Sequence, residues 1–188
     1  MSSVCSTVPL PSGFTVKAGK LFSRVGYLNE KHPHAWDFVD APLVYDAFVA
    51  GNLKDTGVQA RWVAPTDLFL EVGLEAFAGE FFPAAGRASG GKGTYTVFAK
   101  LGGDWDVSNS WQLGVSGIDA QAVGRAEEVH EHGGVAEPEV AFTGDSELFG
   151  VDFVWKWSPN GNYKQRNLVL SAEYLRREES GALEVVFP

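Results

Sequence analysis

Hydrophobic and polar residues alternate along most of this chain, and the alternation is clearest in "WVAPTDLFLEVGLEAFAG", residues 62–79. From Leu68 to Ala78 every second residue is apolar, whereas the residues between them include Glu71 and Glu75. A period of two places alternate side chains on opposite faces of a strand. The pattern therefore predicts a long strand with one apolar face and one face that carries carboxylates.

The same period predicts strands over most of the remaining sequence. They cover residues 13–26, 56–63, 66–80, 93–106, 108–120, 147–158 and 165–178, with an eighth beginning at 182–187 after a turn at "EESG". Strands of about 10 to 14 residues exceed the usual five to six, and about ten residues cross a bilayer at a tilt. No helix is predicted. The sequence indicates an all-β, antiparallel up-and-down meander of about 7–8 long strands, in a transmembrane β-barrel or part of one.

The connections between these strands alternate in length. Strands meet through the short segments "APTD", "DWDVSN" and "SPNGNYK", which contain turn-forming residues. The connections in between are long loops, at residues 27–55, 81–92 and 121–146. In a meander the two kinds lie at opposite ends, as in outer-membrane barrels. Residues 1–12 are expected to be an unstructured leader or remnant, and residues 13–188 the barrel segment.

Most of the 6 tryptophans lie beside the short connections. These candidate membrane-interface residues are Trp62, Trp105, Trp111, Trp155 and Trp157. An indole ring prefers the headgroup layer of a membrane, and barrels carry aromatic girdles at that depth. A soluble core with aromatic residues at these positions is the alternative interpretation.

The two faces of the predicted strands differ in charge. One face is apolar and nearly free of charge, as hydrocarbon requires, because a charge at the bilayer midplane costs about 2–4 kcal/mol. The opposite face carries the candidate lumen-facing residues Glu71, Glu75, Lys100, Asp152, Lys156 and Glu173. The apolar face is therefore expected to contact lipid.

The composition of the chain limits its possible partners and its possible location in the cell. The formal net charge is −9 and no basic stripe is present, which argues against nucleic acid as a partner. The single Cys5 cannot form an intrachain disulfide. The opening "MSSVCSTVPLPSG" lacks the basic start and apolar run of a secretion signal. The chain is expected either to stay inside the cell or to be an internal piece of a longer precursor.

One long loop, "NEKHPHAWDFVD", contains residue types that bind zinc. The candidate metal ligands are His32, His34, Asp37 and Asp40, together with His130 and His132 from another long loop. The alternative is that these side chains make local hydrogen bonds within folded loops. The apolar run "APLVYDAFV" that follows predicts that the first loop packs inward as a constriction.

Three segments carry a family resemblance: "GKLFSRVGYLNEKHPHAWDFVDAPLVYDAF", "DTGVQARWVAPTDLFLEVGLE" and "FTGDSELFGVDFVWKWSPNGN". Over about residues 14–178 the chain resembles porin-like Gram-negative outer-membrane β-barrel proteins, a largely uncharacterised group. Some of its members are labelled TonB-dependent or zinc-regulated. Members of this group are longer, with a secretion signal, an N-terminal portion and further strands. The resemblance implies that the chain is part of a larger barrel.

Two functional hypotheses follow. The first is an outer-membrane, porin-like or receptor-like barrel that passes or captures small solutes, with a link to metal if the loops bind it. The second is a soluble, secreted β-sandwich or jelly roll that binds a carbohydrate-type ligand. No catalytic motif is present, so an enzyme is not expected. Expected partners are outer-membrane lipid, small solutes or ions, and further copies of the chain in a homo-oligomer.

Overall fold

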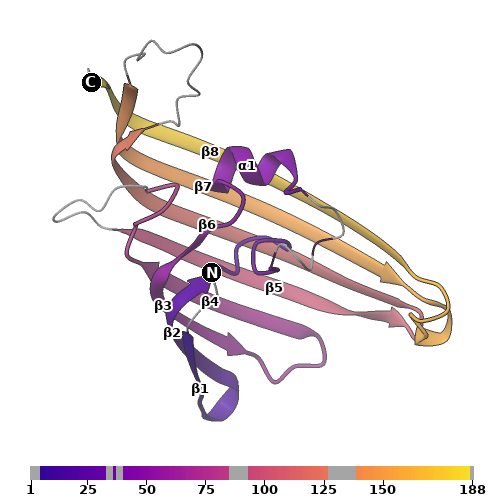
Figure 1. The fold of residues 1–188 in the computed structure, drawn as a ribbon. Coiled ribbons are helices and arrows are strands. Elements are labelled where there is room, and N and C mark those ends of the chain that lie inside the picture. Colours follow the sequence, from indigo (N-terminus) through magenta and orange to yellow (C-terminus); the bar gives the residue numbers. More distant parts are fainter. Residues whose placement is uncertain (1–4, 33–35, 37–39, 85–92, 127–138, 187–188) are drawn as a thin grey trace.

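The computed structural model describes residues 5–32, 36, 40–84, 93–126 and 139–186. Eight strands form one antiparallel sheet in sequence order, so the predicted all-β meander is confirmed (Figure 1). The strands are β1 Cys5–Pro9, β2 Phe14–Phe22, β3 Lys54–Val63, β4 Phe69–Phe77, β5 Thr94–Asp106, β6 Asn109–Ala126, β7 Glu139–Trp157 and β8 Leu168–Val186. One helix, α1, spans Leu43–Val49, and short 3-10 turns lie at Pro11–Gly13 and Pro159–Gly161.

The sheet is open. Within the described residues, β1 pairs with β2 alone and β8 pairs with β7 alone, so the two edge strands do not meet. The last three strands are long, with 18 residues in β6 and 19 each in β7 and β8. The result is a curved wall with two free edges (Figure 1).

Short and long connections lie at opposite ends of the sheet, as predicted. Because every neighbouring pair of strands is antiparallel, successive connections alternate between the two ends. The short-turn end holds the connections at residues 10–13, 64–68, 107–108 and 158–167. The strand ends that flank the longer connections, at residues 23–53, 78–93 and 127–138, lie at the opposite end, here called the long-loop end.

Several boundaries differ from the sequence expectation. Residues 1–12 were expected to be unstructured, but Cys5–Pro9 form β1 and pair with β2. The expected loop 121–146 is shorter, because β6 and β7 extend into it. The expected turn at "EESG" is wrong, since β8 continues through it as one strand. Ser180 and Gly181 there face Asp145 and Gly144 of β7, which keeps the ladder intact.

The connection at residues 23–53, here called the inner connection, folds back over one face of the sheet. Its helix α1, which was not predicted from the sequence, lies near β8 (Figure 1). Tyr45 and Val49 of α1 are buried against Ile118 of β6 and Leu148 of β7. The loop therefore packs against one face of the sheet, as its apolar run predicts, whereas its role as a constriction stays a prediction. We call the covered side of the sheet the inner face and the opposite side the outer face.

In the described part of the chain, no helix has the length and apolar character needed to cross a membrane.

Candidate functional site

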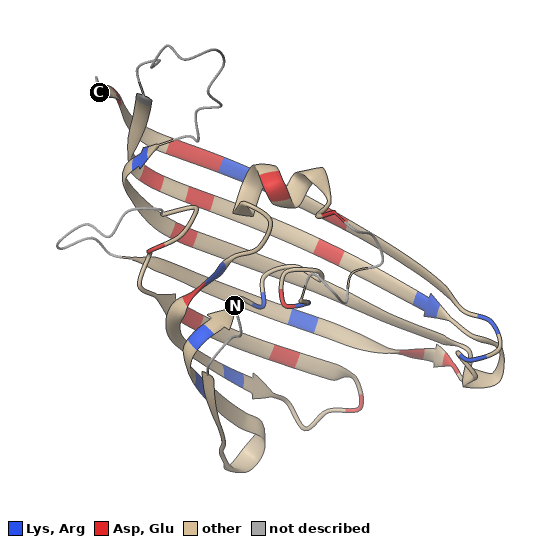
Figure 2. Cartoon of the chain, in the orientation of Figure 1, with Lys and Arg blue, Asp and Glu red and all other residues tan. Residues whose placement is uncertain are grey.

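A row of charged side chains crosses the inner face. Strand register places Glu71 of β4 beside Lys100 of β5, and Lys100 beside Gly114 of β6. Gly114 in turn faces Asp152 of β7, which faces Glu173 of β8. Residues that face one another across neighbouring strands lie on the same side of a sheet. The inner face therefore carries an acid on β4, a lysine on β5 and one acid each on β7 and β8. Figure 2 shows acidic and basic positions distributed along the strands of the sheet.

This row is buried by the inner connection. Glu71, Lys100 and Asp152 each retain 2% of their exposure, although charged residues seldom lie fully inside a protein. Burying a charge is costly unless it is paired or hydrogen-bonded. The inner connection supplies many of the partners, through Ser23, Arg24, Gly26 and Tyr45.

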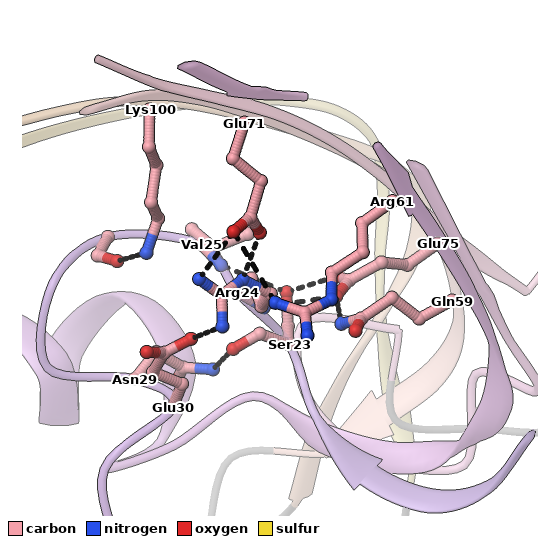
Figure 3. Close-up of polar contacts among 11 residues, drawn as sticks. Ser23, Arg24, Val25, Asn29, Glu30, Gln59, Arg61, Glu71, Glu75 and Lys100 are labelled. Atoms are coloured by element: carbon pink, nitrogen blue, oxygen red, sulfur yellow. Dashed lines mark hydrogen bonds and ion pairs between the residues drawn. The ribbon is translucent and has the colours of Figure 1, made fainter. Parts of the chain in front are cut away.

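Arg24, two residues after β2 ends, forms an ion pair with Glu71 (Figure 3). Its Nε lies 2.7 Å from Oε1 of Glu71, and its Nη2 donates a hydrogen bond of 3.2 Å to Oε2. Arg24 also pairs with Glu30, while Arg61 of β3 lies 3.4 Å from Glu71 Oε2. Two arginines thus neutralise one buried carboxylate, and Arg24 fastens the start of the inner connection to β4.

Glu75 lies four residues after Glu71 on the same face of β4 and accepts hydrogen bonds from four donors. Figure 3 shows Glu75 with Ser23, Arg24 and Gln59. The backbone N–H of Arg24 donates to Oε1 at 3.0 Å, and the side chains of Ser23, Gln59 and Thr96 donate as well. Hydrogen bonds to a charged group are stronger than neutral ones. Glu75 therefore holds the chain where it leaves β2 and turns onto the inner face.

Lys100 has a hydrogen-bond partner in the inner connection, whereas Asp152 has none among the described residues. Lys100 Nζ donates a hydrogen bond of 3.0 Å to the carbonyl oxygen of Gly26. Both carboxylate oxygens of Asp152 are buried and have no hydrogen-bond partner among the described residues. The carboxylate of Asp152 occupies the space that a side chain at Gly114 would need. A glycine at this position of β6 is what lets Asp152 lean toward the lysine.

Glu173 anchors the middle of the inner connection to β8. Its Oε1 accepts hydrogen bonds from the backbone N–H groups of Tyr27 and Leu28, at 3.2 and 3.1 Å. Its Oε2 accepts one of 2.5 Å from the hydroxyl of Tyr45 on α1. Burial first, and the Glu173 charge second, raise the pKa of Tyr45 above its ordinary 10.0, so the hydroxyl stays protonated and donates.

We expect Gly26→Ala to destabilise the folded chain by about 2 kcal/mol or more. Gly26 has a φ of +66°, and a Cβ there would lie 2.5 Å from both Glu173 Oε2 and the Tyr45 hydroxyl oxygen. The methyl group would therefore strain the backbone and also separate two hydrogen-bonded partners. Urea unfolding of the two proteins measures the change in the free energy of unfolding.

Gly51→Ala is the matched control for this prediction. Gly51 also belongs to the inner connection and has a φ of +85°, but its added Cβ would meet one atom, Asp46 Oδ1, at 3.6 Å. Gly51→Ala therefore introduces the same backbone strain as Gly26→Ala but no steric clash. Equal losses in the two variants would contradict a specific role for the close approach at Gly26.

All six residues predicted to face a lumen lie on the inner face. Lys156 is the most exposed of them and lies toward the short-turn end. The partners of this row were not predicted from the sequence: Ser23, Arg24, Tyr45, Gln59 and Arg61. Arg24 was placed in a strand over residues 13–26, whereas β2 ends at Phe22 and the chain then leaves the sheet.

The structure describes two of the six candidate metal ligands. His32 packs edge-on against the Phe22 ring, with centroids 4.8 Å apart, and Asp40 is exposed. His34, Asp37, His130 and His132 lie outside the described residues. Within the described ranges, no group of three or more His, Cys, Asp or Glu side chains could hold a metal ion. The zinc interpretation therefore stays a prediction.

The five candidate interface tryptophans lie toward the short-turn end. Trp111 of β6 faces Trp155 of β7 in the register, and Trp105 stacks on Trp111 with ring centroids 6.4 Å apart. Trp155 donates a hydrogen bond of 3.0 Å to the Asn109 side chain, and Trp62 donates one of 3.0 Å to the Ser12 carbonyl oxygen. The indoles thus form a band near the turns, and the N–H groups of Trp62 and Trp155 have polar partners.

Comparison with known proteins gives one informative match. A protein of Aquifex aeolicus (strain VF5), described as an uncharacterized protein, is 34% identical over 184 residues. The match covers 92% of this chain and 37% of the relative, so the chain spans little more than a third of that protein. No protein-family model and no solved structure matches the chain.

Proposed function

We propose that this chain forms part of the wall of an outer-membrane β-barrel that passes or captures small solutes or ions. The observation that carries the proposal is the reversed distribution of polarity across the sheet. Charged side chains are buried on the inner face, whereas large apolar side chains are exposed on the outer face. Water-soluble proteins rarely expose a continuous apolar patch of this kind, whereas lipid requires one.

The apolar outer face extends over five neighbouring strands, β4 to β8. Its exposed large side chains are Val72, Leu74, Tyr95, Val97, Leu113, Val115, Phe149, Phe153, Leu168, Leu170 and Tyr174. The strand register brings them together into one surface rather than scattering them. Isolated exposed hydrophobic residues are common, but such a surface needs a partner.

The height of this surface suits a bilayer. On β6 it runs from Trp111, in the tryptophan band, to Asp119, which faces Glu147 of β7. Glu147 faces Glu178 of β8, so a row of charges borders the apolar surface at the long-loop end. Eight residue steps span about 27 Å along a strand, or about 21 Å at a tilt of about 40°, close to the roughly 25 Å apolar band of membrane barrels.

The inner connection would control which solutes pass through the barrel. In a barrel the inner face would line the lumen, and residues 23–53 would lie within it. The contacts of Arg24 and Tyr45 with the charged row would then hold the connection against the wall as a constriction. Charges that remain along the wall, with Lys156 nearest the short-turn end, would set the preference among solutes.

A membrane barrel also requires partners for the two edge strands. Unpaired backbone groups on β1 and β8 could not be left in hydrocarbon, where each would cost several kcal/mol. Further strands would have to close the wall, from a longer polypeptide or from other copies of the chain. The Aquifex aeolicus relative, of which the match covers 37%, is long enough to hold such strands.

The test is to direct the chain to the periplasm with a secretion signal and to isolate the outer membranes. Extracted protein is then run on SDS gels with and without boiling. A membrane-resident band whose mobility changes on heating would support a stable barrel. Protein recovered in soluble form, with a cooperative unfolding transition, would overturn the membrane location.

The alternative of a soluble β-sandwich predicts two sheets packed face to face. The described strands form a single sheet instead, and the inner connection covers its inner face alone. Nothing in the described residues covers the outer face in the way that a second sheet would. The membrane proposal therefore accounts for more of the structure than the sandwich does.

A further inference from the structure

A polar pocket of about 550 Å³ lies at the short-turn end of the inner face. The inner connection contributes Tyr27 and Lys31 to its lining, and strands β5, β6 and β7 contribute Asp104, Ser110 and Lys156. The volume falls within the roughly 300–1,000 Å³ of small-molecule sites. The pocket is distinct from the buried network of Glu71 and Lys100, because neither of these residues lines it.

Two lysines converge on one aromatic ring in this pocket. Lys31 Nζ lies 3.7 Å from the centroid of the Tyr27 ring, and Lys156 Nζ lies 5.8 Å from the same centroid. One lysine belongs to the inner connection and the other to the sheet. An ammonium group over an aromatic face gains a modest attraction, but two such groups at one ring repel each other.

Neither lysine has an acidic partner among the residues that the structure describes. The ion pairs of the described residues include neither Lys31 nor Lys156. Asp104 is the carboxylate that lines the pocket, and it faces Ser110, which in turn faces Lys156. Asp104 and Lys156 are therefore two strand spacings apart, about 9–10 Å. In a chain with a formal net charge of −9, two neighbouring lysines without an ion pair to any described carboxylate are unexpected.

From these contacts we propose that the pocket binds a small solute that carries a carboxylate or phosphate group. The oxyanion would lie between Lys31 and Lys156, accept charge-assisted hydrogen bonds from both and relieve their repulsion. Ser110, opposite Lys156, would donate a third hydrogen bond. The remainder of the solute would pack against the Tyr27 ring. The proposal rests on the proposed function, because it names the class of solute that the inner face of the barrel would select.

The experiment is isothermal titration of the full chain with inorganic phosphate and with succinate, with glucose as a neutral comparison. We expect saturable binding of at least one oxyanion and none of glucose. Lys156→Met and Lys31→Met should each weaken that binding about tenfold or more. Circular dichroism spectra would verify that both variants retain the sheet.

Lys164→Met is the matched control, because Lys164 is an exposed lysine of the nearby β7–β8 connection that does not line the pocket. It removes the same charge and should leave affinity unchanged. Equal losses in Lys164→Met and Lys156→Met would overturn the proposal, as would the absence of saturable binding. Binding is measured on the purified chain in detergent or in buffer, so its failure is separate from failure of the membrane test.

Discussion

Replacing Arg24 with methionine should destabilise the folded chain by about 3 kcal/mol, near the lower end of the range for breaking a buried ion pair. The loss arises because Glu71, which is 2% exposed, would keep its charge without its closest partner. Arg61 remains 3.4 Å from Glu71 and limits the effect. Urea unfolding measures the loss, and hydrogen exchange of residues 24–29 shows whether the inner connection has loosened.

Two further variants test whether this loss of stability comes from the buried ion pair. In the double variant Arg24→Met/Glu71→Gln, the buried charge is gone, so the combined loss should be smaller than the sum of the single losses. Arg176→Met breaks the ion pair of Arg176 with Glu178, whose side chains are 65% and 64% exposed, and should change little. If Arg24→Met were as mild as Arg176→Met, the inner connection would not depend on this pair.

The face of each strand was predictable because the side-chain period of a strand is two. Glu71, Lys100, Asp152 and Glu173 were assigned to one face from alternation within their own strands, and the structure places all four there. Their arrangement in one row was not predictable. It depends on the register between strands, which long-range pairing sets and which no pattern within a single strand encodes.

The inner connection was harder to predict in detail. Alternation continues through "LFSRVG", so the predicted strand ran past the observed end at Phe22. Arg24 was therefore assigned to a strand and was not predicted to pair with Glu71. The chain leaves the sheet after Phe22, and the Arg24 N–H then donates to Glu75, a contact distant in sequence that no local pattern reveals. Helix α1 places Val44, Tyr45, Phe48 and Val49 against the core, a helical spacing. Seven residues are too few for a helix to be stable without such packing.

The largest functional effect is expected for Val115→Arg. Val115 lies on the outer face of β6, midway between Trp111 and Asp119, and is 42% exposed. If this face contacts lipid, an arginine near the midplane costs about 2–4 kcal/mol. The variant should then be depleted from the outer-membrane fraction and should fold into phospholipid vesicles with a free energy reduced by that amount, as urea titration would measure. In a water-soluble protein the same change at an exposed position should alter stability by no more than about 0.5 kcal/mol.

Val107→Arg is the matched control, because it adds the same charge outside the apolar outer face. Val107 lies in the short β5–β6 connection, beyond the tryptophan band, and is 74% exposed. An arginine there would reach headgroups and water, so the variant should insert as the unmodified chain does. Depletion of Val115→Arg alone would place the apolar outer face in lipid. Equal recovery of both variants in soluble form would instead require another partner for that face, because so continuous an apolar surface is not stable in water by itself.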